Sequence, residues 1–180
     1  MLYKYSDMLA QYGSAYQVAK AAGELGLVKV APGLYSSEPN PSPATVTCTL
    51  YPQAVLTMGS AFYLHGLTDV VPVCVHVATP RNSTRIRRPG VRQYFMEKGL
   101  MAVGVETVEM GGAQARVFSR ERMLVELLRA SAKLPPDYYK EIVGSYRKVV
   151  HELDMREVED ALDLYKRADG LFDKLQGEIL

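Results

Sequence analysis

The stretch from Leu27 to Ser36, LVKVAPGLYS, decides the fold of the N-terminal part of the chain. Its two ends, residues 27–30 and 34–36, are rich in the branched and aromatic side chains that are typical of strands. Between them Ala31-Pro32-Gly33 supplies turn residues, because proline presets its own φ and glycine accepts a left-handed backbone. The sequence therefore predicts a strand, a tight turn and a second strand.

Two short helices are predicted upstream of this hairpin. Apolar residues within positions 2–11 recur on one helical face, and Gly13 breaks the pattern. Ser14 is a typical N-cap for a second helix over residues 15–22, which is expected to end at Gly23. Two helices followed by a two-stranded wing are the outline of a reduced winged helix-turn-helix.

A proline-rich segment, SSEPNPSP at residues 36–43, predicts a domain boundary. Prolines at three alternate positions hold the backbone extended and exclude a helix there. We therefore expect a winged helix-turn-helix module over residues 1–37 and a second domain over residues 44–180. A stiff strap packed on the second domain is the alternative reading of the same segment.

The second domain is predicted to be a small mixed sheet followed by helices. A helix is expected from about Pro52 to His65, with proline in its first turn. Four strands follow from β-branched and alternating patterns, the last two joined as a hairpin: residues 71–78, 91–95, 101–110 and 113–118. The chain is thus expected to have an α+β fold, with the sheet at about residues 71–118 and helices at about residues 119–179.

The overall charge excludes one class of function. Among 180 residues, Lys and Arg number 21 and Asp and Glu number 20, giving a formal net charge of +1. A histone-like polycation, or any chain that binds polyanions by bulk charge alone, is excluded by this balance. A local basic patch is not excluded, so the charges must be counted segment by segment.

Other compositional features predict a cytoplasmic protein without membrane contact. The longest uncharged apolar stretch, residues 70–78, is too short to cross a bilayer. The N-terminus lacks a basic segment followed by an apolar run, so we expect no targeting peptide. Cys48 and Cys74 form no disulfide framework, and with three scattered histidines they form no metal-ligand cluster.

Catalytic motifs are sparse, and we expect no enzymatic activity, cofactor or metal. The sequence has no glycine-rich phosphate loop and no G-x-S-x-G elbow. Gly59-Ser60 resembles the opening of a nucleotidyltransferase motif, but Asp69 is followed by two valines rather than by the second metal-binding carboxylate. His76 stands between two valines of a predicted strand, so its side chain is expected to face solvent.

The middle of the chain carries a short, strongly basic stretch. Residues 79–100 contain six basic side chains and one acidic side chain. Arginine forks with Ser, Thr and Asn donors between them suit phosphate oxygens. Five arginines are therefore candidate contacts to a nucleic-acid backbone: Arg81, Arg85, Arg87, Arg88 and Arg92. Two alternatives stay open. The loop binds an acidic protein or RNA, or it is a solvated loop whose arginines pair with the acidic C-terminal helices.

The winged module supplies a second set of candidates for DNA contact. Four lie in the second helix or at its start and one on the wing: Ser14, Tyr16, Gln17, Lys20 and Lys29. Residues 1–37 carry only three lysines against two acidic residues, which predicts modest affinity for a monomer. We therefore expect DNA binding to recruit residues 81–92 or a second subunit. The alternative is that the wing is a packing or dimerisation unit.

Four segments resemble, in the same order, the antitoxins of the abortive-infection AbiE (type IV toxin–antitoxin) family, the AbiEi-like proteins. They are GLVKVAPGLYS at residues 26–36, YPQAVLTMGSAFYLHGLT at residues 51–68, residues 73–80 with the arginine run that follows, and VFSRERMLVELL at residues 117–128. The resemblance spans about residues 10–175. It implies an N-terminal winged helix that binds operator DNA and represses its own operon. It also implies a C-terminal domain that counters a neighbouring nucleotidyltransferase toxin without forming a simple tight complex with it.

Overall fold

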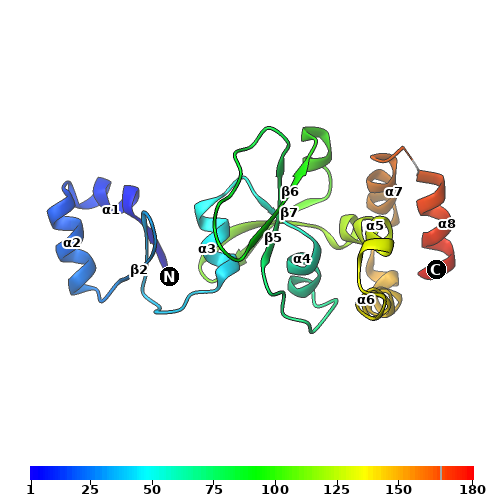
Figure 1. The fold of residues 1–180 in the computed structure, drawn as a ribbon, viewed down its shortest axis with the longest axis horizontal. Helices are drawn as coiled ribbons and strands as arrows, with labels where there is room; N and C mark the ends of the chain where they lie inside the picture. Colours follow the sequence, from blue (N-terminus) through cyan, green and yellow to red (C-terminus); the bar gives the residue numbers. More distant parts are fainter. Residues whose placement is uncertain (167) are drawn as a thin grey trace. The chain divides into compact units, whose positions relative to one another are not determined.

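The computed structural model describes residues 1–166 and 168–180 and has a mixed α+β fold. Its contacts divide the chain into two compact units (Figure 1). One unit comprises Met1–Gln53 and Thr107–Ala115, and the other comprises Ala54–Glu106 and Arg116–Leu180. The proline-rich segment at residues 36–43 lies inside the first of these units.

The first unit begins with a strand, two helices and a β-hairpin. These elements are β1 (Leu2–Lys4), α1 (Tyr5–Tyr12), α2 (Ala15–Glu24), β2 (Val28–Ala31) and β3 (Leu34–Ser36). The three strands form one antiparallel sheet in the order β1-β3-β2. The predicted hairpin is thus confirmed, with Pro32-Gly33 as its turn and Gly33 at φ 72°.

The first helix starts later than its periodicity predicts, and this part of the prediction is wrong. Residues 2–4 are extended because they pair with β3, with Tyr3 opposite Tyr35. This pairing joins segments far apart in the sequence, so a local pattern does not reveal it. The second helix also passes through Gly23, and Gly26, at φ 63°, follows its end.

A small apolar cluster holds the two helices together. Met8 of α1 packs with Val18 and Ala22 of α2, and partly buried tyrosines surround them. The turn between the helices contains Gly13 at φ 81°, whose N–H bonds to the carbonyl of Leu9. The Ser14 hydroxyl accepts a hydrogen bond from the N–H of Gln17, which confirms the predicted N-cap.

The helix predicted from Pro52 to His65 is wrong in its first half. The chain instead forms α3 (Pro43–Leu50), β4 (Val55–Leu56) and α4 (Met58–Leu64). Val55 and Leu56 are extended because they pair with strands on both sides. α3 was not predicted, since its proline was read as part of an extended segment, yet Pro43 stands in the first turn of a helix, where proline is tolerated.

A five-stranded sheet has the order β6-β5-β4-β8-β7. Besides β4 its strands are β5 (Val75–Pro80), β6 (Val91–Met96), β7 (Val105–Met110) and β8 (Ala113–Phe118). β5 pairs antiparallel with β4 and parallel with β6. The strands begin later than predicted at residues 75 and 105, whereas β8 and the Gly111-Gly112 turn agree with the sequence.

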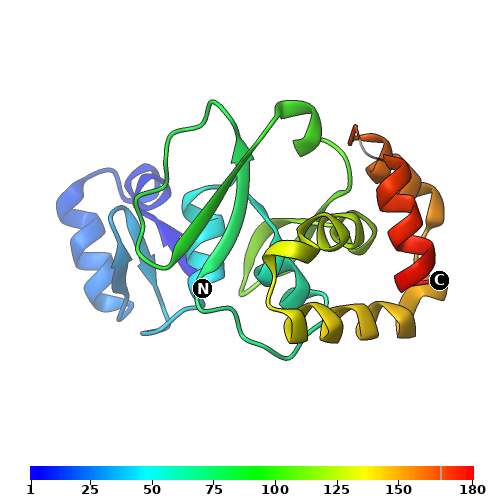
Figure 2. The same ribbon diagram turned by 45° about the vertical axis from the view of Figure 1, so that its right-hand side comes forward.

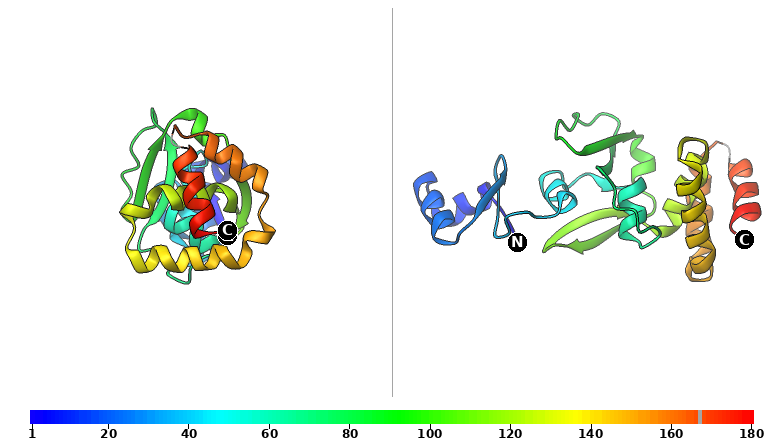
Figure 3. Two further views of the ribbon diagram at one scale, coloured as in Figure 1. Left: turned by 90° about the vertical axis from the view of Figure 1, so that its right-hand side faces the viewer. Right: turned by 60° about the horizontal axis from the view of Figure 1, so that its bottom comes forward.

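Four helices complete the second unit: α5 (Arg120–Ala130), α6 (Pro136–Val149), α7 (Met155–Asp163) and α8 (Ala168–Glu178). Every residue from Glu121 to Leu128 is buried, which makes α5 the central helix of this unit. α5 contacts α4, α7 and α8, and the last two lie side by side (Figure 3). Within the described residues, each helix is too short or too polar to cross a lipid bilayer.

Candidate functional site

The outer face of α2 carries three of the predicted DNA contacts. Tyr16, Gln17 and Lys20 are all exposed, and Tyr16 is 75% exposed despite its large ring. Their positions in the helix place them on one side, opposite Val18 and the other buried residues. An exposed tyrosine beside polar side chains is available to a partner.

The other two predicted residues of this unit differ in their availability. The Ser14 hydroxyl is exposed but already caps α2. Lys29 is exposed on β2, opposite Tyr35 of β3. Lys20 has an acidic neighbour, Glu24, with 3.8 Å between Nζ and Oε1; both side chains are largely exposed, so this ion pair is weak.

A loop rich in arginine, residues 81–90, connects two neighbouring parallel strands. Each strand has six residues and spans about 20 Å, so the chain must return over that whole length to begin β6. Figure 2 shows this connection as an extended segment that runs back beside the strands. Because β5 and β6 are parallel, the loop between them must lie extended alongside the sheet.

Gln93 of β6 fastens this loop at its centre. Its side-chain oxygen accepts the Ile86 N–H at 2.7 Å, and its side-chain nitrogen donates to the Thr84 carbonyl at 3.2 Å. The same nitrogen donates to the Thr79 hydroxyl at 2.8 Å. A glutamine within a strand thus fixes the course of the basic loop.

Three of the four arginines in the loop have no carboxylate partner within the described ranges. In the described part of the chain, Arg85, Arg87 and Arg88 have no carboxylate within ion-pair distance. Arg81 Nη1 lies 3.9 Å from Glu97 Oε1, and both side chains are largely exposed. Among the described residues, none of these arginines forms an ion pair with the acidic C-terminal helices.

Arg92 lies apart from the loop arginines. Residues alternate between the faces of a strand, so Arg92 and Tyr94 share the face of β6 opposite to Gln93. The guanidinium carbon of Arg92 lies 5.5 Å from the centre of the Tyr94 ring. The register of the parallel pair places Arg92 beside His76. Arg92 therefore belongs to a different surface, which faces a cavity.

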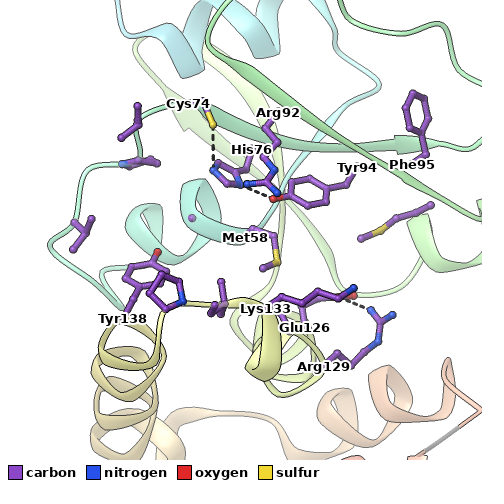
Figure 4. Close-up of a pocket in the computed structure, with 18 of the residues that line it drawn as sticks. Met58, Cys74, His76, Arg92, Tyr94, Phe95, Glu126, Arg129, Lys133 and Tyr138 are labelled. Atoms are coloured by element: carbon purple, nitrogen blue, oxygen red, sulfur yellow. Dashed lines mark hydrogen bonds and ion pairs between the residues drawn. The ribbon is translucent and has the colours of Figure 1, made fainter.

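The cavity is a feature of the second unit that the sequence did not reveal. It has a volume of about 1150 Å³. β5, β6 and the segment Val70–Cys74 form one side, and the end of α5 and the start of α6 form the other. Figure 4 shows Cys74, His76 and Tyr94 on the strand side, with Tyr138 and Lys133 across from them.

His76 connects three polar groups at this cavity. Its Nδ1 lies 2.9 Å from the Tyr94 hydroxyl, and its Nε2 lies 3.4 Å from Cys74 Sγ. Its backbone N–H donates to the hydroxyl of Ser60, which is buried at the start of α4. The expectation of a solvent-facing strand histidine is wrong: the side chain is half-buried, and both ring nitrogens have partners.

Burial and charge alter the acidity of this cluster. Burial lowers the pKa of His76, and the neighbouring Arg92 charge lowers it further. Burial also raises the pKa of Tyr94. The imidazole is therefore held in its neutral form and the phenol in its protonated form near neutral pH. The spacing Cys74-x-His76 was the available sequence signal, but the contribution of Tyr94 depends on strand pairing.

On the helix side of the cavity, Arg129 forms an ion pair with Glu126. Arg129 Nη1 donates to Glu126 Oε2 at 2.6 Å, and its guanidinium carbon lies 3.6 Å from the centre of the Tyr165 ring. Lys133, in contrast, is exposed and has no carboxylate within ion-pair distance in the described part of the chain. Among the described cations that line the cavity, Arg92 and Lys133 are thus the two without a carboxylate partner.

The described residues bring together no group of three or more His, Cys, Asp or Glu side chains that would hold a metal ion. Gly59 and Ser60, the residues that resemble the opening of a nucleotidyltransferase motif, instead pack beside His76. No protein-family model matches the chain, and no curated protein matches it.

Proposed function

We propose that the protein is a cytoplasmic DNA-binding autoregulator that also serves as the antitoxin of a type IV toxin–antitoxin system. It binds operator DNA through a winged helix-turn-helix, represses its own operon and counters a nucleotidyltransferase toxin. The observation that carries the proposal is the order of elements in the first unit: a helix, a glycine turn, a second helix with an exposed polar face, and a β-hairpin.

The first unit has the parts that a DNA-reading helix needs. In helix-turn-helix proteins the second helix enters the major groove while the first crosses the backbone. The second helix here is α2, and Tyr16, Gln17 and Lys20 are its exposed polar side chains. In the sheet order β1-β3-β2, the first strand pairs with the hairpin that carries Lys29. This pairing stabilises the wing.

The charge of this unit predicts weak binding by one copy. Each phosphate contact changes the slope of log K against log salt by about 0.9, and α2 with the wing offers only Lys20 and Lys29. The unpaired arginines of the loop, or a second subunit in a homodimer, would supply further contacts. The antitoxin role is supported by the ordered resemblance of four segments to the AbiEi-like proteins.

The test of the DNA-binding role uses labelled DNA from upstream of the gene. The triple variant Y16A/Q17A/K20A should weaken binding at least tenfold and flatten its dependence on salt. The control is Lys140→Ala, which removes one exposed lysine from α6. Equal binding by the triple variant and the wild type would overturn the proposed use of α2.

The test of the antitoxin role uses cells that express the neighbouring gene. Coexpression of the wild-type chain should restore growth, and Y16A/Q17A/K20A should restore it equally if neutralisation and repression are separate. If the wild-type chain restores no growth, the antitoxin role is overturned whatever the DNA result.

A second function is favoured by the unpaired arginines alone. In this alternative the protein is an interaction module that grips an acidic protein or RNA through the basic region Arg81–Arg92. The triple variant R85A/R87A/R88A should then abolish capture of that partner while Lys20→Ala leaves it unchanged. The reverse pattern on operator DNA would favour the winged module.

A further inference from the structure

We propose that Cys74, His76 and Tyr94 form a nucleophilic thiol site, which accepts an acyl group from an activated ester or thioester bound in the cavity. This inference is independent of the proposed DNA binding. It rests on three features: the side-chain geometry, the access of Cys74 to the cavity, and the exposed valines and two unpaired cations in the described part of the cavity wall.

The geometry has the form of a nucleophile, a base and a group that orients the base. Cys74 Sγ lies 3.4 Å from His76 Nε2, within the range of a hydrogen bond to sulfur. His76 Nδ1 lies 2.9 Å from the Tyr94 hydroxyl on the neighbouring strand. With the proton on Nδ1, the imidazole donates to Tyr94 and its Nε2 is free to accept the thiol proton of Cys74.

The imidazole is held firmly in this position. Parallel pairing of β5 and β6 fixes His76 and Tyr94 on one face of the sheet, and their rings stack with centres 5.7 Å apart. The backbone N–H of His76 is bound by Ser60. Burial and the Arg92 charge lower the pKa of His76, so the ring is neutral and able to accept a proton near neutral pH.

The two cysteines differ in access to a reagent. Cys74 is half-buried and lines the cavity. Cys48 is buried in α3, and burial raises the pKa of its thiol to about 11. Because the thiolate is the nucleophile, Cys48 is an inert internal reference for the reactivity of Cys74.

The cavity wall indicates the chemical class of the acyl donor. Next to Cys74, the valines Val70, Val71 and Val73 are at least half exposed, and Val73 is completely exposed. Such a cluster suits an apolar acyl chain. Arg92 and Lys133, which have no carboxylate partner among the described residues, suit an anionic carrier group. The ligand class is therefore an apolar acyl thioester on an anionic carrier.

A strained residue lies in the same wall. Met58 has φ 44°, and among the described residues it is the only one other than glycine with positive φ. Its side chain lines the cavity. Left-handed backbone is strained in a residue with a Cβ, and such strain is concentrated at functional sites.

Acyl transfer to Cys74 needs no cofactor and changes no oxidation state. His76 Nε2 takes the proton from Cys74 Sγ as the sulfur attacks the carbonyl carbon of the donor. The bond between that carbon and the carrier sulfur then breaks, and the departing thiolate takes the proton from Nε2. The products are an acyl thioester on Cys74 and the free carrier thiol.

The experiment uses p-nitrophenyl acetate, with release of nitrophenolate and the mass of the Cys74 peptide as readouts. The wild type and Cys48→Ala should release a burst of one equivalent and carry one acetyl group on Cys74, and Cys74→Ser should do neither. His76→Gln should slow the burst about 100-fold, the usual contribution of a general base. Tyr94→Phe keeps the ring but loses the hydroxyl, and should slow it less. Acetylation elsewhere, or full rates in both His76→Gln and Tyr94→Phe, would overturn the proposal.

The donor class is tested separately with acetyl-coenzyme A, an anionic thioester. Lys133→Ala should reduce the acylation rate with acetyl-coenzyme A several-fold more than the rate with neutral p-nitrophenyl acetate. An equal loss of acylation rate with both donors, or no loss with either, would contradict the assignment of an anionic carrier. Loss of operator binding in Y16A/Q17A/K20A with an intact burst would separate this site from the proposed DNA-binding function.

Discussion

Glu126 Oε1 accepts hydrogen bonds from both Nε and Nη2 of Arg122, at 3.0 and 2.8 Å, and both side chains are almost completely buried. The remaining nitrogen of Arg122 donates to the carbonyls of Leu100 and Val103. The Tyr165 hydroxyl and Arg129 complete the bonding of Glu126. A buried charge pair with every polar atom satisfied thus links α5 to the segment after β6.

Removal of one member of this pair should destabilise the second unit strongly. Glu126→Gln leaves the Arg122 charge buried without a counter-charge, a change that costs about 3 to 5 kcal/mol. The loss would be measured as a fall in the free energy of unfolding in urea. The matched control is Glu152→Gln, whose half-exposed ion pair with Arg120 should be worth about 1 kcal/mol or less. Equal effects of the two substitutions would contradict the assigned role.

Gly104 should tolerate no side chain, because it lies directly against Arg122. Its φ is 64°, and an added Cβ would come within 2.6 Å of the Arg122 Cβ. Gly104→Ala combines left-handed strain with a clash against a buried helix, so we expect a loss of about 2 to 4 kcal/mol in unfolding free energy.

The control for Gly104 is Gly112→Ala. Gly112 has φ 76° but open space around its Cβ position, so only the backbone strain is added. We expect a loss of about 1 kcal/mol there. If the two alanine variants had the same stability, the close approach of Gly104 to Arg122 would be disproved.

Local sequence signals were sufficient to predict those elements that depend on residues close together in the sequence. The hairpin at residues 27–36, the N-cap Ser14, and the strands β6 and β8 all follow from turn chemistry, capping and alternation. The predicted α+β class is correct for the same reason. Each of these features depends on residues within a few positions of one another.

Long-range pairing explains what the sequence did not reveal. Residues 2–4 and 55–56 become strands only because distant strands bind them, and a helical pattern in each segment pointed elsewhere. The cluster of Cys74, His76 and Tyr94 depends on the register between β5 and β6. The same register placed Arg92 on the cavity face, away from the arginines with which it was grouped.

Gln93 should control the order of the arginine loop. Gln93→Ala removes three hydrogen bonds that hold Thr79, Thr84 and Ile86. Each such bond is worth about 1 kcal/mol, so opening of the loop should become at least tenfold more frequent. Limited trypsin cleavage after Arg85 or Arg87 would measure this opening. Gln114→Ala, an exposed site on β8, should leave the cleavage rate unchanged, and an unchanged rate in Gln93→Ala would refute the anchoring role.

Cys48 should make stability depend on pH in the alkaline range. Its thiol has a pKa of about 11 in the folded chain because it is buried, against an ordinary value of 9.0. The folded state therefore favours the protonated thiol. The stabilising contribution is complete below pH 9 and is lost as the pH rises toward 11, because the unfolded chain ionises first. Between pH 8 and pH 10 we expect a loss of about 1 kcal/mol in unfolding free energy from this residue.

Other groups titrate in the same range, so the Cys48 contribution must be isolated by difference. Cys48→Val lacks the thiol, and the loss of stability between pH 8 and pH 10 should be smaller in this variant by about 1 kcal/mol. Cys74→Val is the matched control, since it removes the half-exposed cysteine and leaves Cys48 in place. The same pH dependence in wild type and Cys48→Val would show that burial does not hold this thiol protonated, and Cys48 would then lose its value as the inert reference for Cys74.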